Sequence, residues 1–198
     1  MLKKVTLLLA TSLSLFALHT VELNINQKDL GLGFGLDIGQ FNDNVEPNTT
    51  FVGMKMFFPD TGNPSSSLGS KDPYFEGNFL IMRPIGDVGL SLGIGFKLNY
   101  TQEKDVTFMS LPIGLETSYE LPFPEFVPMF LDANIYYAVE VLSFLDAQNY
   151  VEYGVSYNVE MIDKVILKVG YRNINTNYFE IGESTYNVSF NAGVEISF

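Results

Sequence analysis

The sequence of 198 residues has no cysteine, one histidine and 11 basic residues against 23 acidic ones. Without cysteine the protein has no disulfide, no thiolate metal site and no residue for a lipoprotein anchor. Its net charge of −12 repels nucleic acid, and it also repels anionic lipid headgroups unless divalent cations intervene. We therefore expect no nucleic-acid partner.

The beginning of the chain has the pattern of a secretory signal peptide. Lys3 and Lys4 precede an uncharged run over 5–18, and the small or polar residues Ala17 and Thr20 follow. This run is too short to span a bilayer as a helix, so we expect a signal at 1–20, cleaved between 17 and 20. Cleavage leaves 9 basic and 23 acidic residues, a net charge of −14. The rest, 21–198, is predicted to be one domain.

Long hydrophobic runs are also missing after the predicted signal, since none approaches the ~20 residues of a transmembrane helix. What recurs instead is alternation with a period of two, which predicts strands and excludes a helical protein. The chain ends on "YNVSFNAGVEISF", in which every second residue is apolar. Alternating segments are 21–26, 30–38, 52–58, 75–81, 88–100, 109–119, 129–141, 151–161, 165–171 and 186–198.

These ten segments predict an all-β protein with a single closed antiparallel transmembrane β-barrel. Bacterial barrels have an even number of strands because both termini lie in the periplasm, so ten is expected, with eight as the alternative. The connections are expected to alternate between long outer loops such as "NINTNYFEIGE" and short periplasmic turns such as "IDK". Loop 59–73 would then lie outside the cell.

The residues between the apolar positions decide whether the apolar face meets lipid or a protein core. In 88–100 they are small and mostly uncharged, Gly89, Ser91, Gly93, Gly95, Lys97 and Asn99. A soluble lipocalin-like barrel carries a charged face toward water, whereas small polar side chains suit a narrow lumen. Aromatic residues near strand ends are expected to form girdles at the headgroups; they are Phe41, Phe58, Tyr100, Tyr119, Tyr150, Tyr171, Tyr186 and Phe198.

The final residues also resemble a known signal. Phe198, preceded by Ile196 and Val194 at every second position, is similar to the signal that outer-membrane barrels present to their insertion machinery. The stretches "VELNINQKDL", "DIGQFNDNVEPNTTFVG", "YYAVEVLSFLDAQNYVEYGV" and "VGYRNINTNY" resemble the YfaZ family of predicted outer-membrane proteins. The resemblance implies a barrel in the cell outer membrane, reached through the periplasm. It implies no reaction, cofactor or ligand.

Enzymatic activity is not expected. Hydrolases of this membrane need a histidine as general base, and His19 lies at the edge of the predicted signal. The glycine-rich stretches do not fit G-x-G-x-x-G and lie within strands. We expect no cofactor and no metal centre. The expected partners are outer-membrane lipid and lipopolysaccharide, the barrel-insertion machinery and divalent cations at the acidic loops, and a monomer is the expected state.

The lumen is the candidate site, and its charges can be placed by assuming a register for each hairpin. Opposite residue numbers sum to about 326 across "IDK", about 292 across the loop near Leu145 and about 248 across "LPFPEF". These sums predict a periplasmic tier of Glu116, Asp132, Glu160 and Lys168 and an outer tier of Glu140, Glu152 and Arg172, with Lys97 also inside. Two hypotheses follow, a salt-bridged plug in a structural or interaction protein, and a small passive, porin-like channel that prefers cations.

Overall fold

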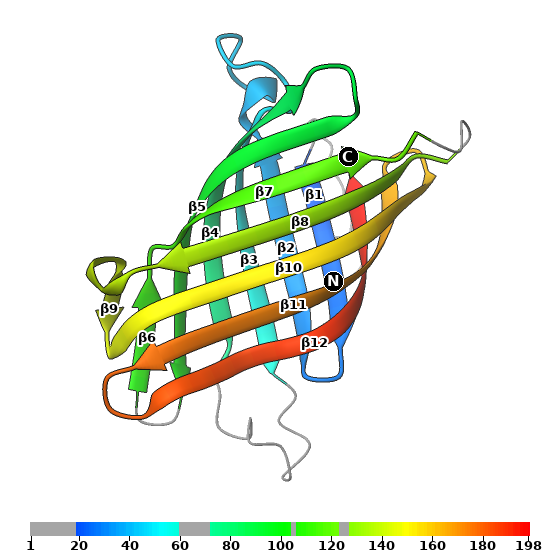
Figure 1. The fold of residues 1–198 in the computed structure, drawn as a ribbon. Helices are drawn as coiled ribbons and strands as arrows, with labels where there is room; N and C mark the ends of the chain where they lie inside the picture. The colour runs from blue at the N-terminus through cyan, green and yellow to red at the C-terminus, as the bar shows by residue number, and fades with distance from the viewer. Residues whose placement is uncertain (1–18, 60–71, 104–105, 123–126) are drawn as a thin grey trace, which may run out of the picture.

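The computed structural model describes residues 19–59, 72–103, 106–122 and 127–198 (Figure 1). Within these ranges the chain forms twelve β-strands and two short 3₁₀ helices, η1 (Ile38–Gln40) and η2 (Glu140–Leu142). The strands are β1 (His19–Asn26), β2 (Asp29–Asp37), β3 (Thr50–Pro59), β4 (Tyr74–Ile85), β5 (Leu90–Glu103), β6 (Val106–Ser110), β7 (Ile113–Glu120), β8 (Met129–Ala138), β9 (Ser143–Leu145), β10 (Ala147–Ile162), β11 (Val165–Tyr178) and β12 (Gly182–Ser197).

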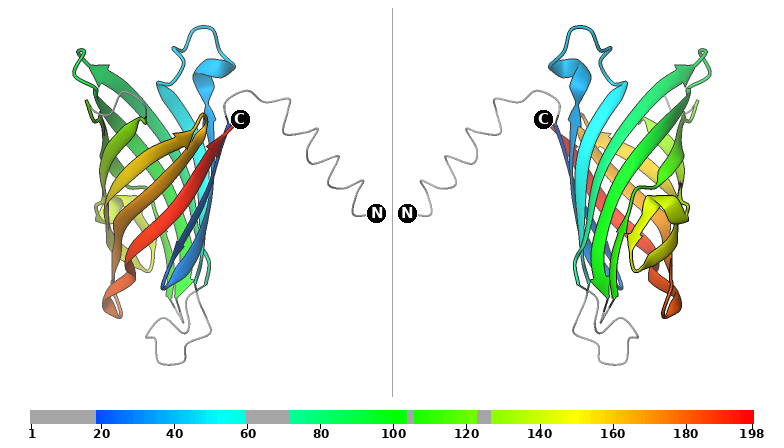
Figure 2. Two further views of the ribbon diagram at one scale, coloured as in Figure 1. Left: turned by 90° about the vertical axis from the view of Figure 1, so that its right-hand side faces the viewer. Right: turned by 90° about the vertical axis from the view of Figure 1, so that its left-hand side faces the viewer.

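Ten of these strands close into a single antiparallel barrel, which confirms the predicted fold and strand number. The ring runs β1-β2-β3-β4-β5-β7-β8-β10-β11-β12 and closes where β12 pairs with β1. At the closure the backbone amides and carbonyls of His19 and Phe198 exchange two hydrogen bonds of 3.0 Å. Figure 2 shows the strands tilted around a common interior.

The expected strand at 109–119 is interrupted, because Leu111 and Pro112 separate β6 from β7. Both strands pair with β5 in one continuous register, with Asn99 opposite Ser110 and Phe96 opposite Ile113. Proline has no N–H to donate to a ladder, and here the Pro112 carbonyl accepts the Lys97 amide at 3.0 Å. On their other side β7 pairs with β8 and β6 with β9, so β6 and β9 lie outside the ring.

The alternation places apolar side chains on the outside and polar ones in the interior, as predicted. Along β5, Leu92 and Ile94 are 48% and 56% exposed, whereas Lys97 is 6% exposed. Val155 on β10 is 50% exposed. A soluble barrel has the opposite arrangement, with apolar residues facing its interior.

The predicted separation of long and short connections is wrong. Most of "NINTNYFEIGE" belongs to β11 and β12, and only 179–181 connect them. Polar residues such as Asn175 and Asn177 continue the ladder there, since backbone pairing does not depend on apolar side chains. At the end of the barrel where β1 begins and β12 ends, which we call the end that carries the termini, the connection 38–49 is longer than the turn at 163–164.

Parts of the sequence prediction lie outside the described residues. They include residues 1–18 of the predicted signal and most of the 59–73 loop. β1 begins at His19, so the predicted cleavage interval of 17–20 overlaps its first two residues. No helix within the described ranges is long and apolar enough to cross a membrane.

Candidate functional site in the barrel lumen

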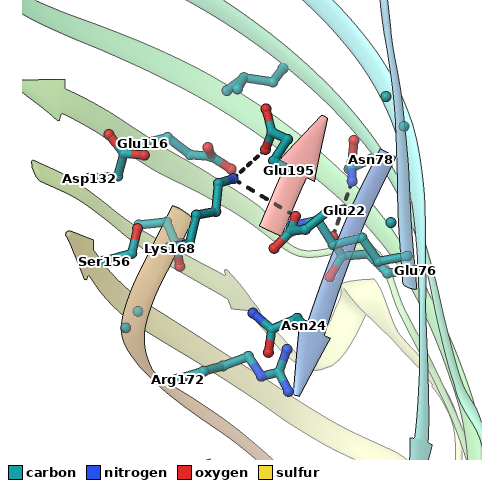
Figure 3. A pocket seen from close by; sticks show the side chains of 18 of the residues that line it. Glu22, Asn24, Glu76, Asn78, Glu116, Asp132, Ser156, Lys168, Arg172 and Glu195 are labelled. Atoms are coloured by element: carbon teal, nitrogen blue, oxygen red, sulfur yellow. Dashed lines mark hydrogen bonds and ion pairs between the residues drawn. The ribbon is translucent and has the colours of Figure 1, made fainter. Parts of the chain in front are cut away.

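The lumen contains a cavity of about 470 Å³. It reaches toward the end of the barrel that carries the termini, where Thr20, Met82 and Ser118 line it. Figure 3 shows charged side chains from several strands facing this space. Its lining includes the acidic residues Glu22, Glu76, Glu116, Asp132, Glu152 and Glu195 and the basic residues Lys55, Lys97, Lys168 and Arg172.

One wall of the cavity carries a balanced network of ion pairs. Glu22 on β1 binds Lys55 of β3 at 3.0 Å and lies 4.0 Å from Lys168 of β11. Lys168 also pairs with Glu195 on the neighbouring strand β12 (Figure 3). Two lysines therefore meet two carboxylates across four strands, and this network leaves no net charge in the wall.

Lys97 on β5 reaches past β7 and β8 to a partner on β10. Its ammonium lies 2.7 Å from Glu152 on β10 and 3.3 Å from Glu76 on β4. The same ammonium lies 4.2 Å from the centre of the Tyr136 ring, within the range of a cation–π interaction. All three charged side chains are almost fully buried. Each charge therefore depends on its partners, because an unpaired buried charge is costly.

The Tyr136 side chain packs closely against two glycines of the neighbouring strands β5 and β7. A Cβ at Gly95 or Gly114 would collide with the ring or its hydroxyl. This hydroxyl donates a 2.5 Å hydrogen bond to Glu116. The glycine-rich stretch of β5 thus has a packing role, which matches the prediction that small lumen residues relieve crowding.

Farther from the termini, Arg172 of β11 occupies a second buried ion pair. Its Nη2 lies 2.9 Å and 3.2 Å from the two oxygens of Asp29, and Asn187 donates to the same carboxylate. The guanidinium lies 3.9 Å from the centre of the Phe57 ring. Arg172 therefore contacts the charged lumen through Asp29 and the aromatic residues through Phe57.

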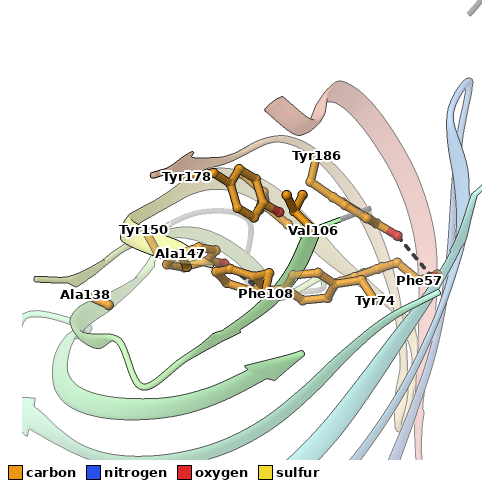
Figure 4. Packing of buried hydrophobic residues seen from close by; sticks show 10 residues of the cluster. Phe57, Tyr74, Val106, Phe108, Ala138, Ala147, Tyr150, Tyr178 and Tyr186 are labelled. Atoms are coloured by element: carbon orange, nitrogen blue, oxygen red, sulfur yellow. Dashed lines mark hydrogen bonds between the residues drawn. The ribbon is translucent and has the colours of Figure 1, made fainter. Parts of the chain in front are cut away.

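Beyond the charged cavity, aromatic side chains from opposite strands fill the lumen (Figure 4). We call the buried residues Phe57, Tyr74, Phe108, Tyr150, Tyr178 and Tyr186 the aromatic cluster. The hydroxyls of Tyr74 on β4 and Tyr150 on β10 share a 2.7 Å hydrogen bond, and Tyr150 donates to Glu152 at 2.8 Å. Phe108 comes from β6, so a strand outside the ring helps to close this end.

Two predicted girdle residues are buried in this cluster instead of facing headgroups. Tyr150 lies in the inward phase of β10, two residues before Glu152, a phase relation that the sequence already shows. Tyr186 changes face because the pairing of β11 with β12 shifts between Ile174 and Asn175, which inserts one residue. Such a bulge reverses the alternation, and no sequence signal marked it.

The structure brings together six of the eight candidate lumen charges in the cavity lining, namely Glu116, Asp132, Glu152, Lys97, Lys168 and Arg172. Glu140 instead lies exposed in η2. Glu160 is near the turn at 163–164, where it accepts the Lys164 amide at 3.3 Å. The predicted place of Glu140 in the outer tier with Glu152 is therefore wrong. Glu160 is a diagonal neighbour of Lys168, as the predicted register requires, but it does not line the cavity.

Register explains these differences. The sum of 326 across "IDK" is confirmed, since Asn158 lies opposite Lys168. Across the loop near Leu145 the sum is 288 instead of 292, with Tyr136 opposite Glu152, because η2 and β9 make that connection asymmetric. Across "LPFPEF" it is 250, with Asp132 opposite Ser118. Both shifts are even, so Glu116 and Asp132 still face inward.

Sequence reasoning missed five charged partners in the lumen, Glu22, Asp29, Lys55, Glu76 and Glu195. Four of them, all but Asp29, occupy the polar phase of their alternating segments. Extending the face assignment to every segment would have found these four. Their pairing requires the order of strands around the ring, which links β12 to β1 and leaves only β7 and β8 between β5 and β10.

The described part of the chain contains no group of three or more histidine, cysteine or acidic residues that could hold a metal ion. His19 packs in an aromatic setting at the start of β1, stacked on Phe41 at 5.5 Å and edge-on to Phe198 at 6.0 Å between ring centres. The site therefore consists of ion pairs, amides and hydroxyls around a cavity.

No known family model matches this chain, and no curated protein does. The resemblance to the YfaZ family stays a prediction.

Proposed function

We propose that the protein is an integral outer-membrane β-barrel of the structural or interaction type, with a narrow and largely plugged lumen. We further propose that it belongs to the YfaZ family and that residues 1–20 are the signal for its export. Its apolar surface would contact lipid. Its partners would be lipopolysaccharide and divalent cations at the acidic loops, and it would function as a monomer.

The observation that carries this proposal is the polarity of the barrel wall. Exposed apolar side chains such as Leu92, Ile94 and Val155 cover the outside, whereas ion pairs such as Lys97 with Glu152 lie in the interior. Hydrocarbon favours this arrangement, since apolar residues face lipid and a closed ring leaves no unpaired strand edge. Water would favour the reverse.

Two features support a plugged lumen. The aromatic cluster fills the lumen on one side of the cavity, and the hydrogen bond between Tyr74 and Tyr150 joins opposite walls. In the charged part, the ion pair of Lys97 with Glu152 links β5 to β10, which do not pair with each other. A solute passing along the axis would have to displace both.

Cell fractionation with gel mobility tests the location and the fold together. We expect the mature protein in the outer-membrane fraction, running faster unheated than boiled because the closed barrel stays folded in cold detergent. Recovery in the soluble fraction without a heat-dependent shift would contradict the proposal.

A small passive cation-preferring channel is the second candidate function, because carboxylates outnumber bases by six to four among the charged residues of the cavity lining. Planar-bilayer recording of the purified folded barrel separates the two candidates. A plugged barrel gives no resolvable current, whereas a channel gives a current whose reversal potential in a salt gradient follows the cation.

The C-terminal residues supply a separate prediction for assembly. Ile196 is exposed on the outside of β12, and Phe198 pairs through its backbone with His19 at the closure of the ring. Replacing Phe198 with Asp should lower the amount of inserted protein while synthesis stays constant, measured by comparing membrane and whole-cell immunoblots. Phe179→Asp, a change at an exposed aromatic residue between β11 and β12 and away from this closure, is the matched control. Equal insertion of Phe198→Asp and the original chain would contradict an assembly role.

A further inference from the structure

The cavity is closed by the aromatic cluster on one side and extends toward the termini on the other. Phe57 belongs to both, because it lines the cavity and packs in the cluster. A volume of about 470 Å³ lies within the range of small-molecule sites. The space is therefore a dead-end pocket of a size that holds a small ligand.

The surplus negative charge of the pocket is concentrated on one wall. Lys97 is shared by Glu76 and Glu152, and no ion pair forms at Glu116 or Asp132 within the described residues. Glu116 receives a hydrogen bond from a tyrosine and Asp132 one from the Asn158 amide at 2.5 Å. Glu116 on β7 and Asp132 on β8 are diagonal neighbours, since Ser118 lies opposite Asp132. This wall offers carboxylates without a cation.

Buried amide oxygens in the cavity lining independently indicate which kind of ligand the pocket would bind. Asn24 is only 7% exposed and lines the cavity, and its Nδ2 donates to Asn191 at 3.1 Å. Its Oδ1, on the wall across the ring from Glu116, has no hydrogen-bond partner among the described residues. Oδ1 of Asn134 has none either, and Asn134 on β8 lies directly opposite Glu116 on β7. Arg172 Nε is an unmatched donor in the same lining. Buried polar atoms are normally paired, so these acceptors favour a ligand that brings N–H donors.

An organic ammonium satisfies both observations better than a metal ion does. It carries a positive charge and three N–H donors. A divalent metal needs several oxygen ligands around one point, and no acidic cluster in the described ranges provides them.

We propose that this pocket binds a small organic cation with one or two primary ammonium groups, held by Glu116 and Asp132. The inference rests on the proposed outer-membrane location only for the compartment, because the end with the termini would open to the periplasm. Binding itself requires only the folded barrel.

Calorimetric titration of the purified barrel in detergent with 1,4-diaminobutane tests the proposal. We expect saturable binding with one ligand per barrel, and no binding of butane-1,4-diol, which has the same length and no charge. Absence of saturable heat up to about 10 mM diamine, or equal binding of the diol, would overturn it.

Carboxylate variants locate the site. The double variant Glu116→Gln, Asp132→Asn should weaken diamine binding at least ten-fold, whereas Glu140→Gln removes a charge from exposed η2 and should leave binding unchanged. Heat-shifted mobility verifies that each variant is folded. Unchanged affinity in the folded double variant would overturn the assignment.

A thiol label attached to an introduced cysteine after the barrel has folded gives a second test, which does not depend on the carboxylate variants. Ser156 lines the cavity (Figure 3), and the chain has no cysteine of its own. In Ser156→Cys, a bulky neutral thiol reagent should abolish diamine binding, and diamine should slow the labelling. Binding that survives complete labelling would overturn the pocket and leave the barrel's location standing. A protein that is recovered in the soluble fraction but still binds diamine would overturn the location and leave the pocket standing.

Discussion

The two parts of the lumen differ in what fills them, although the same strands build both. Toward the termini the interior is hollow and charged, whereas beyond Lys97 it is packed with aromatic rings. On β10 the change occurs within two residues, from Glu152 to Tyr150, and a hydrogen bond of 2.8 Å joins them. The difference shows that inward side chains, not strand geometry, decide where this barrel is open.

Each part satisfies its buried polar groups in its own way. In the charged part, lysines are shared between carboxylates, as Lys97 is by Glu76 and Glu152. In the aromatic part, the hydroxyls of Tyr74 and Tyr150 bind one another. Buried polar groups without partners are costly. Substitutions in the charged part and in the aromatic part should therefore measure how much stability or closure the partners in each part provide.

Removing the aromatic closure should have the largest effect. In the double variant Tyr74→Ala, Phe108→Ala the lumen loses two fully buried rings whose centres lie 6.3 Å apart. We expect resolvable bilayer currents where the original barrel gives none, with a preference for cations from the carboxylates below. The free energy of unfolding should fall by about 3–5 kcal/mol per ring.

A lipid-facing aromatic residue provides the control for that experiment. Phe79→Ala removes an exposed ring from the outer side of β4 and should open no current. If the folded double variant conducts no better than Phe79→Ala, the cluster is not the closure.

Breaking the central ion pair is expected to have the next largest effect. Lys97→Met leaves Glu76 and Glu152 buried without a cation. Loss of one partner of a buried pair costs about 3–5 kcal/mol, which urea titration followed by gel mobility would measure. A loss below about 1 kcal/mol would mean that water already screens these carboxylates.

Adding a methyl group to β5 where it packs against Tyr136 should lower the free energy of unfolding moderately. Gly95→Ala places a Cβ against the Tyr136 hydroxyl, while Gly77→Ala on the adjacent strand β4 has no atom within 4 Å of its new Cβ. We expect a loss of about 1–3 kcal/mol for the first and little change for the second, measured by the same urea titration. Equal stability of the two variants would show that the ring moves aside freely.

The smallest effect should come from an ion pair outside the lumen. Arg83 lies 2.5 Å from Glu46, and both side chains are exposed. Arg83→Met should lower the free energy of unfolding by no more than about 1 kcal/mol because water screens the pair. Set beside Lys97→Met in one urea series, it measures how much burial adds to an ion pair of this barrel.

The fold could be predicted from the sequence because alternation is a local property. The ten expected segments all carry strands, and Leu92, Val155 and Lys97 lie on the predicted faces. The candidate site could be predicted less well from the sequence, because the residues that meet in the lumen depend on the register between strands. The extra residue at Tyr186 turned a predicted girdle side chain inward, and the insertion of η2 and β9 moved side chains that the hairpin sums had paired.

The central claim is that the apolar face of the barrel meets lipid, and two adjacent positions on β10 test it most directly. Val155 is half exposed on the outside, and Ser156 lines the cavity. Nitroxide labels on Val155→Cys and Ser156→Cys, in liposomes, report collisions with oxygen, which concentrates in lipid, and with a water-soluble nickel chelate. We predict that the label at 155 collides mainly with oxygen and the label at 156 does not. A label at 155 that collides freely with the chelate would contradict the account.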